Sequence, residues 1–249
     1  MSNKKKIALI LVLIGAAFFI LSPPVLPENI SSEELLNLAG GKDTVIVFSS
    51  GGWGNTPLEK AKDYYSVVLG IQNTLSDMGH QSVVVTYNRT KDDLLGMVTA
   101  YKEFFNSFEL SSKDLASDLN NFLEKDSSKK IILTGLSNGA TFMTKTAEKV
   151  PDQFNQSIYV ISAGTPFWYK AHQSERILQL DRTQDSLHKG DIHFLTTIAF
   201  NAPVKWFSSR INGQPLTFSQ SLHFPGHDYY WDSSEVGPRI KEFLEANFQ

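Results

Sequence analysis

Residues 130–140 read KIILTGLSNGA, an apolar β-branched run that leads directly into a Gly-x-Ser-x-Gly pattern. Apolar residues at helical spacing follow this pattern until Pro151. The stretch predicts a strand, a sharp turn with Ser137 at its tip, and a helix. A turn this tight brings the positions two before and two after the serine together, so Gly135 and Gly139 fit where a larger side chain would collide.

Short apolar runs alternate with helical patterns on both sides of this turn. The runs that predict buried strands are 43–48, 82–87, 130–134 and 158–163, with a weaker one at 177–180. Helical spacing covers 58–78, 94–105, 143–150 and 236–244, and a further helix is expected to start at N-cap residues within 111–114. This alternation predicts an α/β fold whose mostly parallel sheet carries helices on both faces.

Composition narrows the classes of function. The chain has 249 residues and a formal charge of −3, which leaves no basic surplus for a phosphate backbone, so we expect no nucleic-acid partner. Cysteine is absent, which excludes disulfides, thiolate zinc sites and a cysteine nucleophile. The six histidines are scattered, so we also expect no metal site and no metal cofactor.

Residues 1–26 resemble an export segment. Three lysines at 4–6 precede an apolar run at 7–21, and two prolines follow at 23–24. The run is shorter than the roughly 20 residues that span a bilayer, and no small-x-small cleavage pattern precedes the prolines. We expect an uncleaved membrane anchor, with a cleaved signal peptide as the alternative. Residues 27–249 would then form one domain outside the cytoplasm, either anchored or secreted or periplasmic.

The serine motif in its strand–turn–helix setting resembles the nucleophile elbow of the α/β-hydrolase superfamily. The resemblance covers about residues 43–248 and indicates no particular subfamily. It implies that Ser137 is a nucleophile, that Gly135 and Gly139 shape the elbow, and that an acid and a histidine follow in this order along the chain.

The resemblance also places the histidine on a loop shortly before the last helix, where His223 and His227 stand. His227 is favoured, because its surroundings, PGHDYYW, are similar to the aromatic histidine loop of lipases and esterases. The acid should follow a strand between residue 163 and this histidine. Asp185 is favoured there, Asp181 is second and Asp191 third.

The run FSSGGWG at 48–54 occupies the position of the superfamily's oxyanion loop. In that loop one backbone N–H pairs with the N–H of the residue after the nucleophile, here Asn138. The His-Gly-Gly-Gly form of some lipases is absent, so the donor stays open among Gly51, Gly52 and Trp53.

Residues 164–222 are expected to be an irregular, lid-like insert. The insert carries Phe167, Trp168, Tyr169, Phe194, Trp206 and Phe207. These aromatic residues are interpreted either as a lid or substrate wall or as ordinary core packing.

Together these features predict a serine hydrolase that cleaves a carboxylic ester through an acyl-enzyme and needs no cofactor. A lipid-like or other small acyl substrate is suggested by the aromatic insert and the membrane segment. The alternatives are a peptidase, thioesterase or acyltransferase on the same scaffold, or a binding protein that keeps the fold without catalysis.

Overall fold

The computed structural model describes residues 21–27, 30–170, 174–190, 192–216, 218–221, 224 and 226–249. Most of the expected signal or anchor segment, residues 1–20, therefore lies outside the described residues. Within the described ranges, no helix combines the length and the apolarity that crossing a membrane requires.

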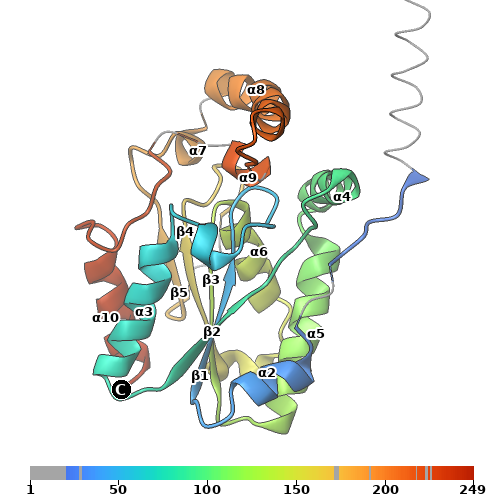
Figure 1. Ribbon diagram of the computed structural model, residues 1–249. Coiled ribbons are helices and arrows are strands. Elements are labelled where there is room, and N and C mark those ends of the chain that lie inside the picture. The colour runs from blue at the N-terminus through green and yellow to red at the C-terminus, as the bar shows by residue number, and fades with distance from the viewer. Residues whose placement is uncertain are drawn as a thin grey trace, which may run out of the picture.

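A five-stranded parallel sheet with the strand order β2-β1-β3-β4-β5 forms the centre of the described structure (Figure 1). The strands are β1 (Thr44–Ser49), β2 (Ser82–Thr86), β3 (Lys130–Leu136), β4 (Ile158–Ala163) and β5 (Ile177–Leu180). The helices are α2 (Ser32–Leu38), α3 (Tyr65–Asp77), α4 (Leu94–Phe105), α5 (Glu109–Lys125), α6 (Asn138–Ala147), α7 (Ser186–Lys189), α8 (Ile192–Ile211), α9 (Phe218–Ser221) and α10 (Gly237–Asn247). The predicted parallel α/β architecture is confirmed.

Helices cover both faces of the sheet (Figure 1). In β1, Ile46 and Phe48 face the layer formed by α3 and α10, whereas Val45 and Val47 face the layer formed by α2, α5 and α6. Every residue of β1 is buried, because alternate side chains of a strand point to opposite faces and both faces carry a helix layer. This double burial explains why the strands appear in the sequence as unbroken apolar runs.

The start of α5 differs from the prediction. The expected N-cap serines, Ser111 and Ser112, lie buried inside the helix, which begins at Glu109. Ser111 donates its backbone N–H and its hydroxyl to the buried carboxylate of Glu103 in α4. The serine is therefore used in a tertiary contact that its local sequence does not reveal.

The insert at 164–222 is more regular than expected, because it contains the twenty-residue helix α8. The sequence concealed this helix for two reasons. Its apolar residues do not leave a polar face, and Pro203 lies inside it. Together with α7 and α9, this helix lies over the end of the sheet at which β3 delivers Ser137 (Figure 1).

Candidate active site

Ser137 stands at the junction of β3 and α6 with a backbone φ of 58° and ψ of −122°. A positive φ is costly for a residue with a side chain and is kept only where the surroundings impose it. Here the Ser137 N–H donates to the Ala163 carbonyl over 2.9 Å, and its own carbonyl accepts from the Thr141 N–H over 3.0 Å. The side chain is 5% exposed.

The two glycines of the motif are sterically required. A Cβ on Gly135 would stand 2.7 Å from the Gly139 carbonyl carbon, and a Cβ on Gly139 would stand 2.2 Å from the Ser49 carbonyl oxygen. Both contacts involve backbone atoms that cannot move aside. The elbow is thus built by the close packing of β3, α6 and the loop after β1.

A cavity of about 440 Å³ opens above the elbow. Its wall includes Ser137, His227 and the loop residues Ser50, Gly51 and Gly52. These residues come from three segments that are far apart in the sequence. The cavity therefore brings the elbow, the histidine loop and the glycine loop to one place.

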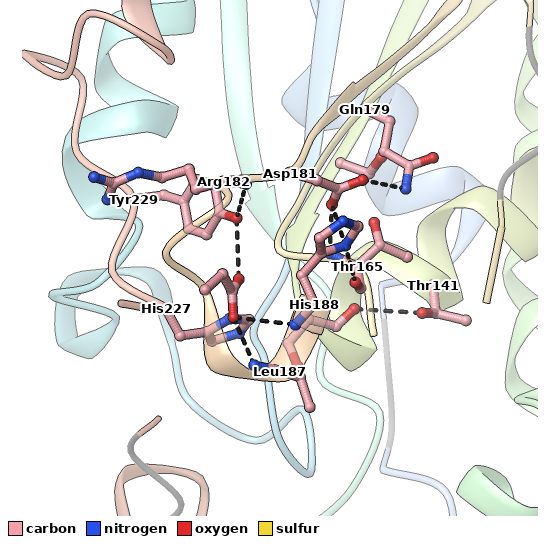
Figure 2. A network of polar contacts seen from close by, with 12 residues as sticks. Thr141, Thr165, Gln179, Asp181, Arg182, Leu187, His188, His227 and Tyr229 are labelled. Atoms are coloured by element: carbon pink, nitrogen blue, oxygen red, sulfur yellow. Dashed lines mark hydrogen bonds and ion pairs between the residues drawn. The ribbon is translucent and has the colours of Figure 1, made fainter. Parts of the chain in front are cut away.

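Asp185 and His227 form a buried pair beside this cavity. The Nδ1 atom of His227 lies 2.7 Å from Oδ2 of Asp185, and the two residues are 6% and 0% exposed. Asp185 follows β5 and caps α7, with its Oδ1 accepting from the N–H groups of Leu187 and His188. Figure 2 shows this network together with Tyr229.

The hydroxyl of Tyr229 adds a fourth donor to the Asp185 carboxylate, at 3.0 Å from Oδ2. Tyr229 is fully buried, and its oxygen accepts the N–H of Arg182. Burial by itself would raise the pKa of the Asp185 carboxyl, but the hydrogen bond and charge of His227 and the helix N–H groups outweigh it and lower the pKa. The carboxylate is therefore ionised at neutral pH and orients the ring of His227.

Close backbone packing holds the His227 ring in place. A Cβ on Gly164 would stand 2.5 Å from Cε1 of His227, and one on Gly226 would stand 2.3 Å from the Gln184 carbonyl oxygen. Both glycines have positive φ, 57° and 75°. The Nε2 atom of His227 is buried and has no hydrogen-bond partner within the part of the chain that the structure describes. With Nδ1 held by Asp185, this second nitrogen is left for the cavity.

The other acid candidates differ in their surroundings. Asp181 accepts the N–H of Thr165 and the amide of Gln179, and lies 3.6 Å from Nδ1 of His188 (Figure 2). It is thus engaged with a different histidine from the one at the cavity. Asp191 and the alternative histidine His223 lie outside the described residues.

Arg89, which the sequence analysis did not single out, holds the loop after β1. Its Nη2 atom donates to the carbonyl oxygens of Ser50 at 3.0 Å and Gly52 at 3.1 Å. Its Nε atom donates to the Ser49 hydroxyl at 3.2 Å. The Gly52 carbonyl also accepts the side-chain amide of Asn138, over 3.2 Å. Two segments thus fix the same carbonyl group of the glycine loop.

These contacts orient the loop's N–H groups. In a trans peptide the carbonyl and the N–H of the following residue point in opposite directions, and no described peptide bond is cis. Because Arg89 binds the carbonyls of Ser50 and Gly52, the N–H groups of Gly51 and Trp53 point away from the guanidinium. A Cβ on Gly51 would stand 3.5 Å from Cβ of Ser137, which places Gly51 against the elbow.

Arg89 is 1% exposed, and the burial of its guanidinium lowers its pKa to about 10, while the negative charge of Glu103 acts in the opposite direction. The group is still cationic at neutral pH. Its guanidinium carbon lies 5.0 Å from the ring centre of Phe108. A charged residue directly after an apolar strand was the available signal in the sequence, but its partners lie about 40 positions upstream.

The aromatic residues of the insert do not line this cavity where they are described. Trp206 is buried in a cluster with Trp53, whereas Phe167, Trp168 and Phe207 are exposed. The side chain of Phe194 lies outside the described part of the chain. Leu216 and Gln220, near the end of the insert, and Phe224, just after it, contribute to the cavity wall instead.

A search of the described residues finds no group of three histidine, aspartate or glutamate side chains arranged to hold a metal ion.

No protein-family model and no curated protein matches the chain. Among solved structures, it is similar to an acetylxylan esterase, with a TM-score of 0.48, 14% identity, and coverage of 82% of this chain and 98% of that one. It is also similar to a Trichoderma reesei cutinase bound to a phosphonate inhibitor, with a TM-score of 0.43, 15% identity, and coverage of 64% and 73%. A cutinase-like protein from Cryptococcus sp. is similar with a TM-score of 0.43 and 15% identity, and the match covers 58% of this chain and 78% of that one.

The topology of the described strands gives independent information about the fold. The parallel strand order β2-β1-β3-β4-β5 places the strand that carries Ser137 next to the strand that carries the glycine loop. The elbow follows β3, Asp185 follows β5 and His227 precedes α10. This is the chain order of serine, acid and histidine in the α/β-hydrolase fold. The strand order and the elbow geometry are consistent with the α/β-hydrolase fold.

Proposed function

We propose that this protein is a serine hydrolase that cleaves carboxylic esters, with Ser137, His227 and Asp185 as its triad. The observation that carries the proposal is that a strained serine shares one cavity with a carboxylate-bound histidine whose Nε2 has no partner among the described residues. Such an arrangement activates a hydroxyl, because the imidazole accepts the proton while the carboxylate stabilises the imidazolium.

In the proposed reaction, the Ser137 hydroxyl oxygen attacks the ester carbonyl and its proton passes to Nε2 of His227. The tetrahedral intermediate then expels the alcohol, which takes that proton, and leaves an acyl-enzyme. Water then attacks the acyl carbonyl as His227 takes its proton, and the bond to the Ser137 oxygen breaks, so that the carboxylic acid leaves and His227 returns the proton to Ser137. The oxyanion is bound by the N–H of Asn138 at the start of α6 and by an N–H of the loop at 51–53, for which Gly51 is favoured by its position against the elbow.

The proposal includes a place for the enzyme. Residues 1–26 either remain as an anchor that holds the domain at the outer face of a membrane, or act as a signal peptide that directs export and is then cleaved. An acyl substrate of lipid-like character would suit that position. A peptidase, a thioesterase or an acyltransferase would use the same residues and differ only in the leaving group or the acceptor.

Fluorophosphonate labelling of the full chain, with the modified peptide mapped by mass spectrometry, tests the proposal. We expect a single adduct on Ser137, which is lost in His227→Ala and slowed in Asp185→Asn. A screen of ester, thioester and amide substrates then ranks the reaction types. A folded chain that takes no label would contradict the hydrolase and favour a binding protein with this fold.

A further inference from the structure

Helix α8 carries a stripe of large apolar side chains that face solvent. Phe200, Val204, Phe207 and Ile211 are 80%, 66%, 59% and 84% exposed. Their spacing of four, three and four residues puts them on one side of the helix, since each residue turns the helix by about 100°. We call these four residues the α8 stripe.

The opposite side of α8 is already occupied. Ala202 and Trp206 are buried in a cluster with Trp53 and with Ala100 of α4. A helix that is apolar on both sides needs a second apolar environment, and contiguous exposed apolar surface marks an interaction site. No described residue buries the α8 stripe, whose four side chains all remain exposed.

The start of the described chain lies beside the same helix pair. The N–H of Val25 donates to the hydroxyl of Thr99 in α4 over 2.9 Å, and Lys102 of α4 donates to the carbonyl of Ser22. Residues 22–25 therefore run along α4, which shares a buried cluster with α8.

This attachment limits where the apolar run at 7–21 can be. Residue 21 stands only four positions before Val25, a reach of about 14 Å at most for extended chain. The run carries no charge and is preceded by three lysines, a pattern that enters lipid. A membrane that receives this run must lie at the α4–α8 end of the domain.

We propose that the α8 stripe lies in the interface of the same lipid bilayer that receives the N-terminal run. This inference rests on the membrane attachment in the proposed function and extends it to a defined docking face. The exposed Lys205 of α8 is suited to lipid headgroups beside an apolar face. A bilayer is the one partner that accounts for both apolar elements at this end of the molecule.

Docking by α8 would place the Ser137 cavity beside the membrane. The segment that follows α8 supplies Leu216 and Gln220 to the cavity wall, and Leu216 is partly exposed. An amphiphile whose acyl chain lies in the bilayer can then present its ester bond to Ser137 without leaving the interface. The inferred substrate class is accordingly an acyl ester of a membrane lipid.

The absence of cysteine allows a direct test, because single cysteines can be introduced for labelling. Full-length Phe200→Cys and Phe207→Cys variants would carry an environment-sensitive fluorophore in nanodiscs of phosphatidylcholine and phosphatidylglycerol, at one copy per disc. We expect a blue shift in emission and a loss of fluorescence when the lipids carry brominated acyl chains. Glu245→Cys, at an exposed position on α10, is the matched control and should show neither change.

Further arms separate this inference from the proposals beneath it. Leu13→Cys reports whether the N-terminal run is in lipid, and fluorophosphonate labelling reports whether Ser137 is reactive. If brominated lipid quenches the fluorophore at Leu13→Cys but the labels on α8 behave like the one at Glu245→Cys, the proposed docking face is wrong. The membrane anchor is then still supported. A blue shift without bromine quenching would also overturn it, because protein would then cover the stripe. If brominated lipid quenches the fluorophores on α8 but fluorophosphonate does not label Ser137, the docking inference is supported and the proposed hydrolase activity is contradicted.

Discussion

The Nδ1 atom of His227 lies 2.7 Å from Oδ2 of Asp185, across a gap of 42 residues in the sequence. An ionised carboxylate can only accept, so the ring donates from Nδ1 and its lone pair is on Nε2. Because Nε2 has no partner in the described structure, the pair is set to accept a proton in the cavity that also contains Ser137. This contact distinguishes the two aspartates that follow β5.

Replacing Asp185 by asparagine should lower kcat by about 10⁴-fold, because an amide at this position favours the wrong histidine tautomer. Asp181→Asn is the matched control, since its carboxylate contacts Gln179 and Thr165 instead, and kcat should stay near that of the parent. Hydrolysis of a soluble nitrophenyl ester measures both. A larger loss of kcat in Asp181→Asn than in Asp185→Asn would make Asp181 the triad acid in place of Asp185.

Replacing Ser137 by glycine should stabilise the fold relative to Ser137→Ala by about 1–3 kcal/mol, because the backbone φ of 58° is strained only for a residue with a Cβ. Both variants lack the hydroxyl that we propose as the nucleophile. Chemical denaturation measures the difference in free energy of unfolding.

The same pair of glycine and alanine variants at the exposed residue Ser117 in α5 is the control, and there the difference in stability should have the opposite sign. In a helix interior, glycine is less stable than alanine by about 1 kcal/mol. Equal stability of the two Ser137 variants, beside a normal difference at Ser117, would contradict strain at the elbow.

Replacing Arg89 by methionine should lower kcat by about 10²–10³-fold with little change in KM, because the loop N–H proposed to bind the oxyanion would lose its fixed direction. Arg89→Lys should recover part of the loss, since it keeps a cationic donor without the planar fork. Arg239→Met, which removes a contact with the Gln179 carbonyl on the surface, is the control.

Titration with fluorophosphonate gives the fraction of active molecules in each Arg89 sample. A fall confined to that fraction, with normal kcat per labelled site, would show that Arg89 acts on folding alone. A fall in kcat per site identifies it as a positioning residue.

Replacing Tyr229 by phenylalanine should lower the free energy of unfolding by about 1.5–3 kcal/mol at neutral pH, the usual contribution of a hydrogen bond to a charged group. The pKa of Asp185 is lower in the folded state than the unfolded value of about 3.9. Its ionised form therefore stabilises the fold above that pH, and this stability is lost as the pH falls through the lower folded pKa.

The difference between the parent and Tyr229→Phe should accordingly shrink below about pH 4, as the carboxylate is protonated. Denaturation across a pH series measures it. Tyr159→Phe removes a bond to a neutral carbonyl, that of Gln156, so its effect should not change over the same range. A Tyr229 effect that is constant down to full protonation would contradict a bond to an ionised Asp185.

The sequence by itself determined the features that depend on neighbouring residues. Short apolar runs predicted the five strands of the described sheet, most clearly the central strands β1, β3 and β4, where burial on both faces leaves few polar positions. The elbow was visible for a similar reason, because its steric conditions fall on Gly135 and Gly139, two positions on either side of Ser137. A pattern within a few residues reports forces that act within those residues.

Only the tertiary structure decided the features whose partners are distant in the chain. Asp181 and Asp185 are alike as residues after a strand, and they differ in which histidine each one meets. The sequence around Arg89 shows a charged residue after a strand but not its role, because the carbonyls that it binds belong to the loop after another strand. The serines of α5 were misjudged for the same reason, whereas α8 was missed because it lacks a polar face and contains Pro203. A buried polar group is satisfied by whatever the fold brings to it, and that contact is not encoded in its own neighbourhood.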